Sequence, residues 1–542
     1  MCCVRGWTDG SGQASGLVGR ARASGLAVVL GLVVGLLSNV VRGAPSSLPD
    51  TLDELRARGE LRWGADANGG APYIFPDPMD PTRIMGFEVE LAAALARKLG
   101  VTSRPVQGQW ESLLDLLNRR DFDVALNGIE VAEEKRRVCA LSRPYYVAAE
   151  KLTVRRGDER LASKEADWRG YTIGTLPGSV AERIVIGRGA MVKTYEGGQN
   201  QIYLDLRDGR TDGVLLDEPV TRYYGSIDPA LAVTEHSWGA VAYAVAVRSE
   251  DVRLRTAIDG ALDELAREGE LRRIYERWGL WNAETARALG DPDETARASV
   301  AAEAFEAWRT AVGEIPPFWE RVRSRYPATF PIFFRAALLT LSLSLVAFMV
   351  VAVPVGLVVA VSRVYGPAPL RWLAVAYVEV VRGTPLLVQL TILYFGLPEL
   401  GLKLDPFVAG ALALGLNYAA AEAENYRAGL QAVPVGQLEA AWSLGMTTSQ
   451  ALRFVLGPQA LRVAIPPMTN DFIALLKDSS LVSLVTLTEL TKTYSSLGNS
   501  MRDHLGLGVV VALWYLAIGL PFALLARAAE RRLGGRHRRP LR

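Results

Sequence analysis

The sequence predicts an α/β domain that is soluble in water, followed by an all-α domain that lies in a membrane. At 542 residues the chain is longer than one ordinary hydrophobic core can serve, so more than one domain is expected. Residues 48–282 alternate apolar and charged positions, whereas residues 333–530 contain long apolar runs with few polar breaks. The two halves are therefore expected to fold in different solvents.

Residues 1–44 are predicted to be a signal peptide or an N-terminal anchor. Arginines precede an apolar run over residues 26–37, and Gly43 and Ala44 follow it, which is the layout of a secretory signal. Arg42 stands at the −3 position if cleavage follows Ala44, and Val41 stands there if it follows Gly43. Export of the next domain is expected, with either a cleaved signal or an uncleaved anchor.

Charge and cysteine content exclude two classes of protein. The formal charge of +2 is too near neutral for a nucleic-acid-binding protein, so no nucleic acid partner is expected. Three cysteines cannot form a disulfide framework, and Cys2 and Cys3 precede the apolar run, which does not support lipoprotein acylation. Cys139 is expected to be a small buried side chain.

Residues 48–282 are predicted to fold as an extracytoplasmic α/β domain. Short apolar segments at 61–64, 122–126 and 172–174 are typical of buried strands, and residues 88–99 have helical character. In open α/β sheets, ligands bind at the carboxyl ends of strands.

Several segments of this domain resemble the amino-acid-type (family 3) periplasmic solute-binding proteins. They are Gly86-Phe87-Glu88-Val89-Glu90-Leu91, Phe122-Asp123-Val124, Pro144-Tyr145-Tyr146, Gly178-Ser179, Gly209-Arg210-Thr211-Asp212-Gly213 with Asp217, and Gly269-Glu270-Leu271. The resemblance implies two lobes that are joined by hinge strands and close around a ligand. Lobe one would be residues 51–148 with the segment after 245, and lobe two would lie between.

The resemblance also implies three residues that bind an amino acid. Asp217 matches the acid that binds the ammonium group, Ser179 matches a hydroxyl donor near the carboxylate, and Trp110 stands where a ring often packs on the ligand. Each also has a structural alternative: a turn acid for Asp217, a helix cap for Ser179 and a core ring for Trp110.

Two candidate ligand-binding residues depart from the family pattern. Lys135 replaces an arginine that grips the carboxylate in two places, and a lysine lacks that planar fork. Glu130 stands where a small hydroxyl residue is common. If Glu130 faces the pocket, the ligand is more cationic than usual or lacks a free α-carboxylate. If Glu130 pairs with Lys135, the pocket is degenerate.

Residues 283–332 are predicted to be a linker, and five membrane spans are expected in residues 333–530. Each is near the 20 residues that a bilayer requires. They are residues 338–361, 372–397, 406–424, 468–490 and 505–527. The basic tail, residues 531–542, places the C-terminus in the cytoplasm by the positive-inside rule, and five spans then place the α/β domain outside.

A motif between the third and fourth spans resembles the cytoplasmic coupling loop of ABC importer permeases of the polar amino acid type. Its residues include Gly436, Glu439, Ala440, Ala441 and Gly445. A short helix from about Val435, ended by Gly445, would dock in a groove of a partner ATPase.

Residues 382–389 and 477–481 resemble the same subfamily. For the charged residues Glu379, Arg382, Lys477 and Asp478, a role in the pathway and structural pairing between spans both stay open.

Together these features predict a multi-pass subunit of the bacterial cytoplasmic (inner) membrane that imports a polar amino acid or a related small solute. The chain has no P-loop pattern, so a separate ABC ATPase would use ATP and Mg²⁺, and this chain would bind no cofactor or metal and have no catalytic residues. Two copies are expected to pair through the membrane domain in contact with lipid.

Two other functional classes are less consistent with the sequence. A ligand-gated channel of the ionotropic-receptor type would insert its pore between the lobes, whereas here all predicted spans follow them. A cell-wall lytic enzyme would need a catalytic domain where these spans stand. An importer for a non-amino-acid amine or an opine remains an alternative within the transporter class.

Overall fold

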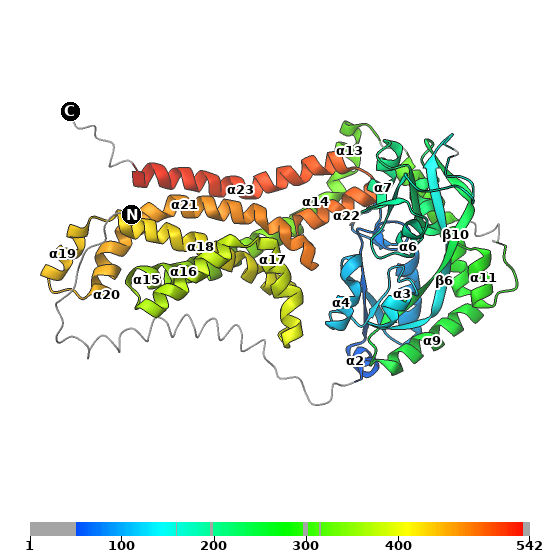
Figure 1. Cartoon of the computed structure of the whole chain (residues 1–542), viewed down its shortest axis with the longest axis horizontal. Helices are drawn as coiled ribbons and strands as arrows, with labels where there is room; N and C mark the ends of the chain where they lie inside the picture. Colours follow the sequence, from blue (N-terminus) through cyan, green and yellow to red (C-terminus); the bar gives the residue numbers. More distant parts are fainter. Residues whose placement is uncertain (1–49, 159, 196–198, 296–301, 314–315, 535–542) are drawn as a thin grey trace.

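The computed structural model describes residues 50–158, 160–195, 199–295, 302–313 and 316–534. The predicted signal or anchor, residues 1–44, and residues 535–542 of the basic tail lie outside the described residues. The described chain forms an α/β domain at one end and a helical domain at the other (Figure 1).

One eight-stranded sheet organises the α/β domain, with strand order β4-β1-β5-β10-β6-β9-β7-β8. In the first half, β1 (Glu60–Ala65) lies parallel to β4 (Thr102–Gln107) and to β5 (Val124–Ala125). In the second half, β7 (Thr172–Thr175) lies parallel to β8 (Met191–Thr194) and β9 (Gly213–Asp217). Strands β2 (Phe75–Pro76) and β3 (Ile84–Met85) form a separate small pair.

Two long antiparallel strands connect the halves of this sheet. β6 (Ala140–Arg155) and β10 (Leu231–Val247) pair along most of their length, from Val247 opposite Ala140 to Leu231 opposite Arg155. Because both strands continue from one half into the other, they are the hinge that the resemblance implied, and the halves are the two lobes.

Helices cover the sheet of each lobe. Lobe one carries α2 (Thr51–Arg58), α3 (Phe87–Lys98), α4 (Leu113–Asn118), α5 (Glu133–Arg136), α9 (Val252–Arg267) and α10 (Glu270–Arg277). Lobe two carries α6 (Val180–Gly187), α7 (Gln199–Arg207) and α8 (Glu218–Val220). In α3 the acidic residues stand in the first turn and the basic residues in the last turn, which complements the helix dipole.

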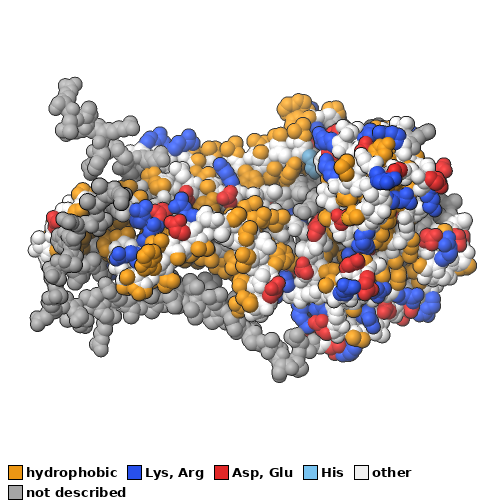
Figure 2. Space-filling model, viewed as in Figure 1, with side chains coloured by type: hydrophobic (Ala, Val, Ile, Leu, Met, Phe, Trp, Pro, Cys, Tyr) orange, Lys and Arg blue, Asp and Glu red, His pale blue; other side chains and the backbone are white. Residues whose placement is uncertain are grey.

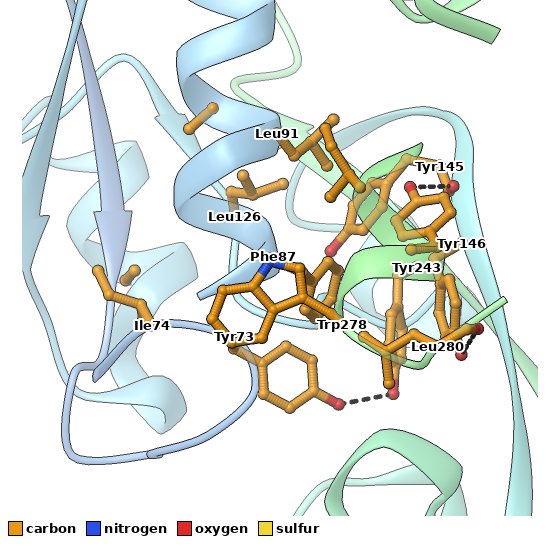
Figure 3. Close-up of a cluster of buried hydrophobic side chains, with 14 of the residues drawn as sticks. Tyr73, Ile74, Phe87, Leu91, Leu126, Tyr145, Tyr146, Tyr243, Trp278 and Leu280 are labelled. Atoms are coloured by element: carbon orange, nitrogen blue, oxygen red, sulfur yellow. Dashed lines mark hydrogen bonds between the residues drawn. The ribbon is translucent and has the colours of Figure 1, made fainter. Parts of the chain in front are cut away.

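Aromatic side chains fill the core of lobe one next to the hinge. Tyr73, Phe87, Tyr146 and Tyr243 are all buried, and the rings of Tyr146 and Tyr243 stack with centroids 5.7 Å apart (Figure 3). Buried aromatic groups of this kind contribute large apolar areas and fixed geometry. The cluster therefore holds the Tyr73 and Tyr243 hydroxyls in place.

The segment predicted as a linker contains two helices that pack on the α/β domain. In α11 (Ala283–Leu289), the Thr285 hydroxyl bonds to Val147 O at 3.1 Å. In α12 (Glu303–Gly313), Phe305 and Trp308 are buried against Tyr223. Much of residues 283–313 thus extends the α/β domain because its apolar residues are spaced to cover the surface of that domain.

The helical domain follows from α13 (Phe318–Ser324). Its longer helices are α14 (Tyr326–Leu345), α15 (Val353–Tyr365), α16 (Ala368–Gly383), α18 (Pro406–Ala432), α21 (Gly457–Asp478), α22 (Leu490–Met501) and α23 (His504–Gly534). Shorter pieces are α17 (Leu386–Thr391), α19 (Val435–Ser443), α20 (Thr448–Ala451) and the turns η3 (Val346–Ala352) and η7 (Ser479–Val485).

Among the described residues, two helical stretches are long and apolar enough to span a membrane. They are Tyr326–Tyr365 and His504–Ala528. Ala368–Gly383 and Leu386–Leu400 pass the same criterion as a pair bent by 105° at their junction, which gives a third if the pair is one span. The helices α18 and α21 do not meet it, so the count of five stays a prediction.

The fourth predicted span, residues 468–490, is not one continuous helix. α21 begins eleven residues earlier, at Gly457, and ends at Asp478. The 3₁₀ turn η7 follows, and Thr486 has a positive φ of 68°. A continuous helix over residues 468–490 was therefore a wrong expectation, because hydropathy alone does not register the turn after Lys477 and Asp478. The position of this span stays a prediction.

The surfaces of the two domains differ in the way that the sequence predicts. Hydrophobic side chains gather over the helical domain, whereas acidic and basic side chains are interspersed over the α/β domain (Figure 2). Exposed apolar residues such as Leu513, Leu516 and Leu525 lie along α23. A helix that exposes an apolar face of this length is suited to contact with lipid.

Candidate functional site: an interlobe cavity and a terminal helix

A cavity lies between the two lobes where the carboxyl ends of β1, β5, β7 and β9 approach each other. It offers about 50 Å³ to the centres of water-sized molecules, so the two lobes leave little free space between them in this conformation. Its wall includes Asp66, Tyr73, Trp110, Asn127, Glu130, Glu150, Ser179, Gln199 and Asp217. Of the five predicted ligand-binding residues, four line the cavity, and Lys135 lies next to it.

Asp217 ends β9 and points one carboxylate oxygen at two tyrosines. Its Oδ2 accepts hydrogen bonds from the Tyr73 hydroxyl at 2.7 Å and from the Tyr243 hydroxyl. Its Oδ1 is buried without a hydrogen-bond partner. Burial raises the pKa of Asp217, and the two tyrosine bonds oppose that rise. Asp217 is therefore anchored through one oxygen and leaves the other available to a donor in the cavity.

Glu130 crosses from lobe one to the first turn of α6 in lobe two. Its two carboxylate oxygens accept from Val180 N at 3.1 and 3.0 Å. Helix N-termini attract anions because their first N–H groups have no partner inside the helix. A carboxylate of the protein itself therefore occupies the anion site of α6.

Lys135 is held between Glu130 and Trp110. Its ammonium nitrogen lies 3.5 Å from Glu130 Oε2 and 4.7 Å from the centre of the Trp110 ring. Burial lowers the pKa of Lys135, and the negative charge of Glu130 opposes this shift. The sequence left open whether Glu130 faces the pocket or pairs with Lys135. In the structure it does both, since it lines the cavity and forms an ion pair with Lys135.

Ser179 and Trp110 combine a structural role with a place on the cavity wall. The Ser179 hydroxyl donates to Leu176 O at 2.8 Å and accepts from Glu182 N at 3.1 Å, which is a helix N-cap. The Trp110 indole donates to Asn127 O at 3.0 Å. The Ser179 hydroxyl already uses its one proton, so it does not have the free donor that the resemblance implied.

Sequence reasoning missed Glu150, Tyr73 and Tyr243. Glu150 is 1% exposed, stands opposite Asp217 in the β6–β9 pairing, and has an oxygen, Oε2, with no hydrogen-bond partner. Burial raises the pKa of Glu150 well above its usual range, and the charges of Asp217 and Glu130 raise it further. One acidic residue within the apolar strand 147–154 was a signal that could have identified it.

The predicted coupling residues lie on or next to α19, at the end of the helical domain farthest from the α/β domain (Figure 1). Gly436, Glu439 and Ala440 are exposed, and Ala441 is buried against its own domain. Gly445 follows the helix with a φ of 76°, a conformation that favours glycine. Leu444 is 79% exposed, so the tip of this region presents an uncovered apolar side chain.

The charged residues of the two other permease-like segments differ in their surroundings. Glu379, Arg382 and Lys477 are exposed, whereas Asp478 accepts a hydrogen bond from the Tyr418 hydroxyl at 2.7 Å. Pairing between helices thus accounts for Asp478.

α22 of the helical domain contacts the wall of the cavity from outside. Asn499 Nδ2 donates to Asn68 O at 2.9 Å, and Ser500 donates to Pro76 O. Lys492 Nζ lies 3.7 Å from Asp66 Oδ1, and Asp66 is itself a cavity residue. The loop between β1 and β2 therefore has the cavity on one side and the helical domain on the other.

Comparison with known proteins assigns the two domains to two families. Residues 61–280 match the bacterial extracellular solute-binding proteins, family 3. Residues 352–535 match the inner membrane component of binding-protein-dependent transport systems. The probable glutamine ABC transporter permease protein GlnM of Bacillus subtilis (strain 168) is 42% identical over 178 residues, which are 33% of this chain and 82% of that protein. The chain belongs to the permease family of polar amino acid ABC transporters.

Two further relatives are similar to different parts of this permease. The L-cystine transport system permease protein TcyB of Bacillus subtilis (strain 168) is 37% identical over 40% of this chain and 91% of its own length. An ancestral arginine-binding protein bound to arginine is 29% identical over 41% of this chain and 98% of its own, with a TM-score of 0.38. The family match of residues 61–280 shows that the permease carries a family 3 solute-binding domain in the same chain. The chain is a transport subunit whose family works with an ABC ATPase.

Proposed function

We propose that this chain is the capture and translocation subunit of an ATP-driven importer for a polar amino acid or a related small solute. The observation that carries the proposal is the interlobe cavity of the binding domain, which shares the Asn68 loop with α22 of the permease domain. A solute bound between the lobes would be held at the surface of the permease domain, and lobe opening would release it there. The similarity to GlnM, a probable glutamine permease, and to TcyB, an L-cystine permease, supports an amino acid or a close relative as solute.

The partner ATPase would bind at α19. Small residues Gly436 and Ala440 allow close approach of another protein, and Leu444 offers an apolar anchor. The ATPase would bring the ATP and Mg²⁺ sites, and two copies of this chain would pair through the permease domain as a homodimer. In this arrangement each transporter carries two tethered binding domains, which raises their local concentration at the pathway.

The proposed membrane arrangement has the binding domain outside and α19 inside the cytoplasmic membrane. Residues 1–44 would be the signal or anchor, residues 48–282 the binding domain, 283–332 its connection, 333–530 the permease domain with five spans, and 531–542 a cytoplasmic tail. The apolar surface of the helical domain supports placing the binding domain and α19 on opposite sides of the membrane (Figure 2). The chain order argues against a ligand-gated channel, because no helix long and apolar enough to span a membrane interrupts the described part of the lobes.

The coupling role of α19 is tested by the charge reversal Glu439→Arg. We expect the variant to lose most of its binding to an amino-acid-type ABC ATPase in a pull-down from co-expressing cells, because Glu439 is exposed on the proposed docking face. Stimulation of ATP hydrolysis by the full chain should fall with it.

The matched control is Glu303→Arg on α12, which makes the same charge change at an exposed position of the binding domain. It should bind the ATPase as the native chain does. Equal ATPase binding by Glu439→Arg and Glu303→Arg would contradict the proposed docking site.

A further inference from the structure

Three carboxyl groups from both lobes converge on the interlobe cavity. Glu130 comes from lobe one, Glu150 from the hinge strand β6, and Asp217 from the end of β9 in lobe two. Among the described lining residues, Asp66 and Glu111 add two more carboxyl groups, and none is a lysine, an arginine or a histidine. The lining is therefore acidic, although Asp66 already accepts hydrogen bonds from Asn68 N, Gln107 Nε2 and Trp110 N.

Two of these carboxyl oxygens are buried and unsatisfied. Glu150 Oε2 and Asp217 Oδ1 have no hydrogen-bond partner, and both residues line the cavity. Buried polar atoms normally have a hydrogen-bond partner, so two unbonded oxygens on the same wall indicate a missing donor. Like charges on Glu130, Glu150 and Asp217 disfavour one another, which a cationic donor would relieve.

Two of the groups that would receive a ligand carboxylate already donate hydrogen bonds within the protein. Val180 N at the start of α6 donates to Glu130, and the Ser179 hydroxyl donates to Leu176 O. The Lys135 ammonium forms an ion pair with Glu130 at 3.5 Å but has no hydrogen-bond partner. Glu130 therefore occupies the anion site at the start of α6 and itself bridges the two lobes.

We propose that the cavity takes an organic cation without a carboxylate group, such as an alkyl diamine or a guanidino amine. The inference rests on the proposed import function and narrows its solute class. A positively charged nitrogen would donate to Asp217 Oδ1 and Glu150 Oε2, while the Trp110 ring, which lines the same cavity, offers an aromatic wall. Glu130 would supply the interlobe contact that a zwitterion brings with it.

Agmatine and arginine test this directly, because they differ only in the α-carboxylate. Isothermal titration of the full chain in lipid nanodiscs, in an amine-free buffer, should show agmatine bound on the order of 100-fold more tightly than arginine. Putrescine should likewise bind more tightly than ornithine.

Two variants should lower the preference for agmatine in different ways. Glu130→Thr frees Val180 N and Lys135, so arginine should gain affinity and agmatine should lose it, with a shift in their ratio on the order of 100-fold. Glu150→Gln keeps the shape of the side chain and should weaken agmatine without improving arginine. Glu133→Gln, an exposed position on α5, should leave both affinities unchanged.

Tighter binding of arginine or glutamine than of agmatine by the native chain would overturn the inference and leave the amino acid importer standing. An unchanged agmatine-to-arginine ratio in Glu130→Thr would overturn the role given to Glu130. If none of these compounds binds, the inference fails together with the capture step of the proposed function, whereas ATPase binding at α19 would still report on the permease domain.

Discussion

Glu88 is the most deeply buried carboxyl group beside the binding cavity. Its Oε1 accepts from Gly128 N at 2.7 Å and from the Tyr145 hydroxyl, and the side chain is fully buried at the start of α3. Burial raises the pKa of Glu88 to about 7; the bonds from Tyr145 and Gly128 oppose the rise, and the charge of Asp217 adds to it. The folded protein thus holds a proton here that the unfolded chain has lost.

This shift predicts a loss of stability as the pH rises. Between the ordinary carboxyl pKa of 4.5 and about 7, the folded state binds more protons than the unfolded state, so the free energy of unfolding falls with pH. Glu88→Gln keeps both hydrogen bonds to Oε1 and removes the charge. At pH 8 it should unfold at a higher temperature than the native chain, with a gain of up to about 3 kcal/mol.

Thermal unfolding at pH 5 and pH 8, followed by tryptophan fluorescence, measures the difference. The variant and the native chain should be close in stability at pH 5. If the unfolding temperatures of the native chain and of Glu88→Gln changed by the same amount between pH 5 and pH 8, the pH dependence would come from a group other than Glu88.

Residue types predicted some roles well and others poorly. Asp217 and Trp110 line the cavity as the family pattern implied, and Cys139 is 2% exposed, as expected for a small core side chain. The contact between Glu130 and Val180 was not predictable, because it joins residues 50 positions apart that meet only when the two lobes approach each other. Pairings across a hinge depend on tertiary geometry that local sequence does not encode.

At the scale of elements, the strands were more predictable than the ends of the helices. The apolar segments at 61–64 and 172–174 coincide with β1 and β7, because short apolar runs between polar stretches are typical of buried parallel strands. Helix ends depend on capping and turns. The 3₁₀ turn after Asp478 and the packing of α12 on Tyr223 both follow from tertiary contacts.

The contacts of α22 predict a way to loosen the two domains without changing the cavity. Replacing Lys492 by Met and Asn499 by Ala removes the ion pair to Asp66 and the hydrogen bond to Asn68 O. Each lost hydrogen bond is worth about 1 kcal/mol, or roughly a fivefold change in an equilibrium constant. Amide hydrogen exchange of residues 66–76 should therefore become at least about fivefold faster in the double variant.

Solute affinity should change little, because Asp66 keeps its bonds from Gln107 and Asn68. Ser495→Ala, a half-buried position on the same helix, is the control and should leave the exchange unchanged. Unaltered exchange in the double variant would mean that other contacts hold the binding domain on the permease domain.

At the scale of the whole molecule, the binding domain, the apolar helices and α19 follow one another along the long axis of the chain (Figure 1). The interlobe cavity lies at one end, α22 contacts the cavity wall, the apolar helices follow, and α19 stands at the opposite end (Figure 1). A binding domain in the same chain does not need to diffuse to its permease, so its effective concentration is set by the short connection between α12 and α13.

ATP-dependent uptake into proteoliposomes tests the central claim most directly. The vesicles would contain the full chain and an amino-acid-type ABC ATPase, with ATP inside and labelled agmatine, arginine or glutamine outside, and no separate binding protein. We predict accumulation of one of these solutes that requires ATP and is lost in Asp217→Ala. Accumulation that is unaffected by Asp217→Ala, or that appears only when a free binding protein is added, would contradict the account.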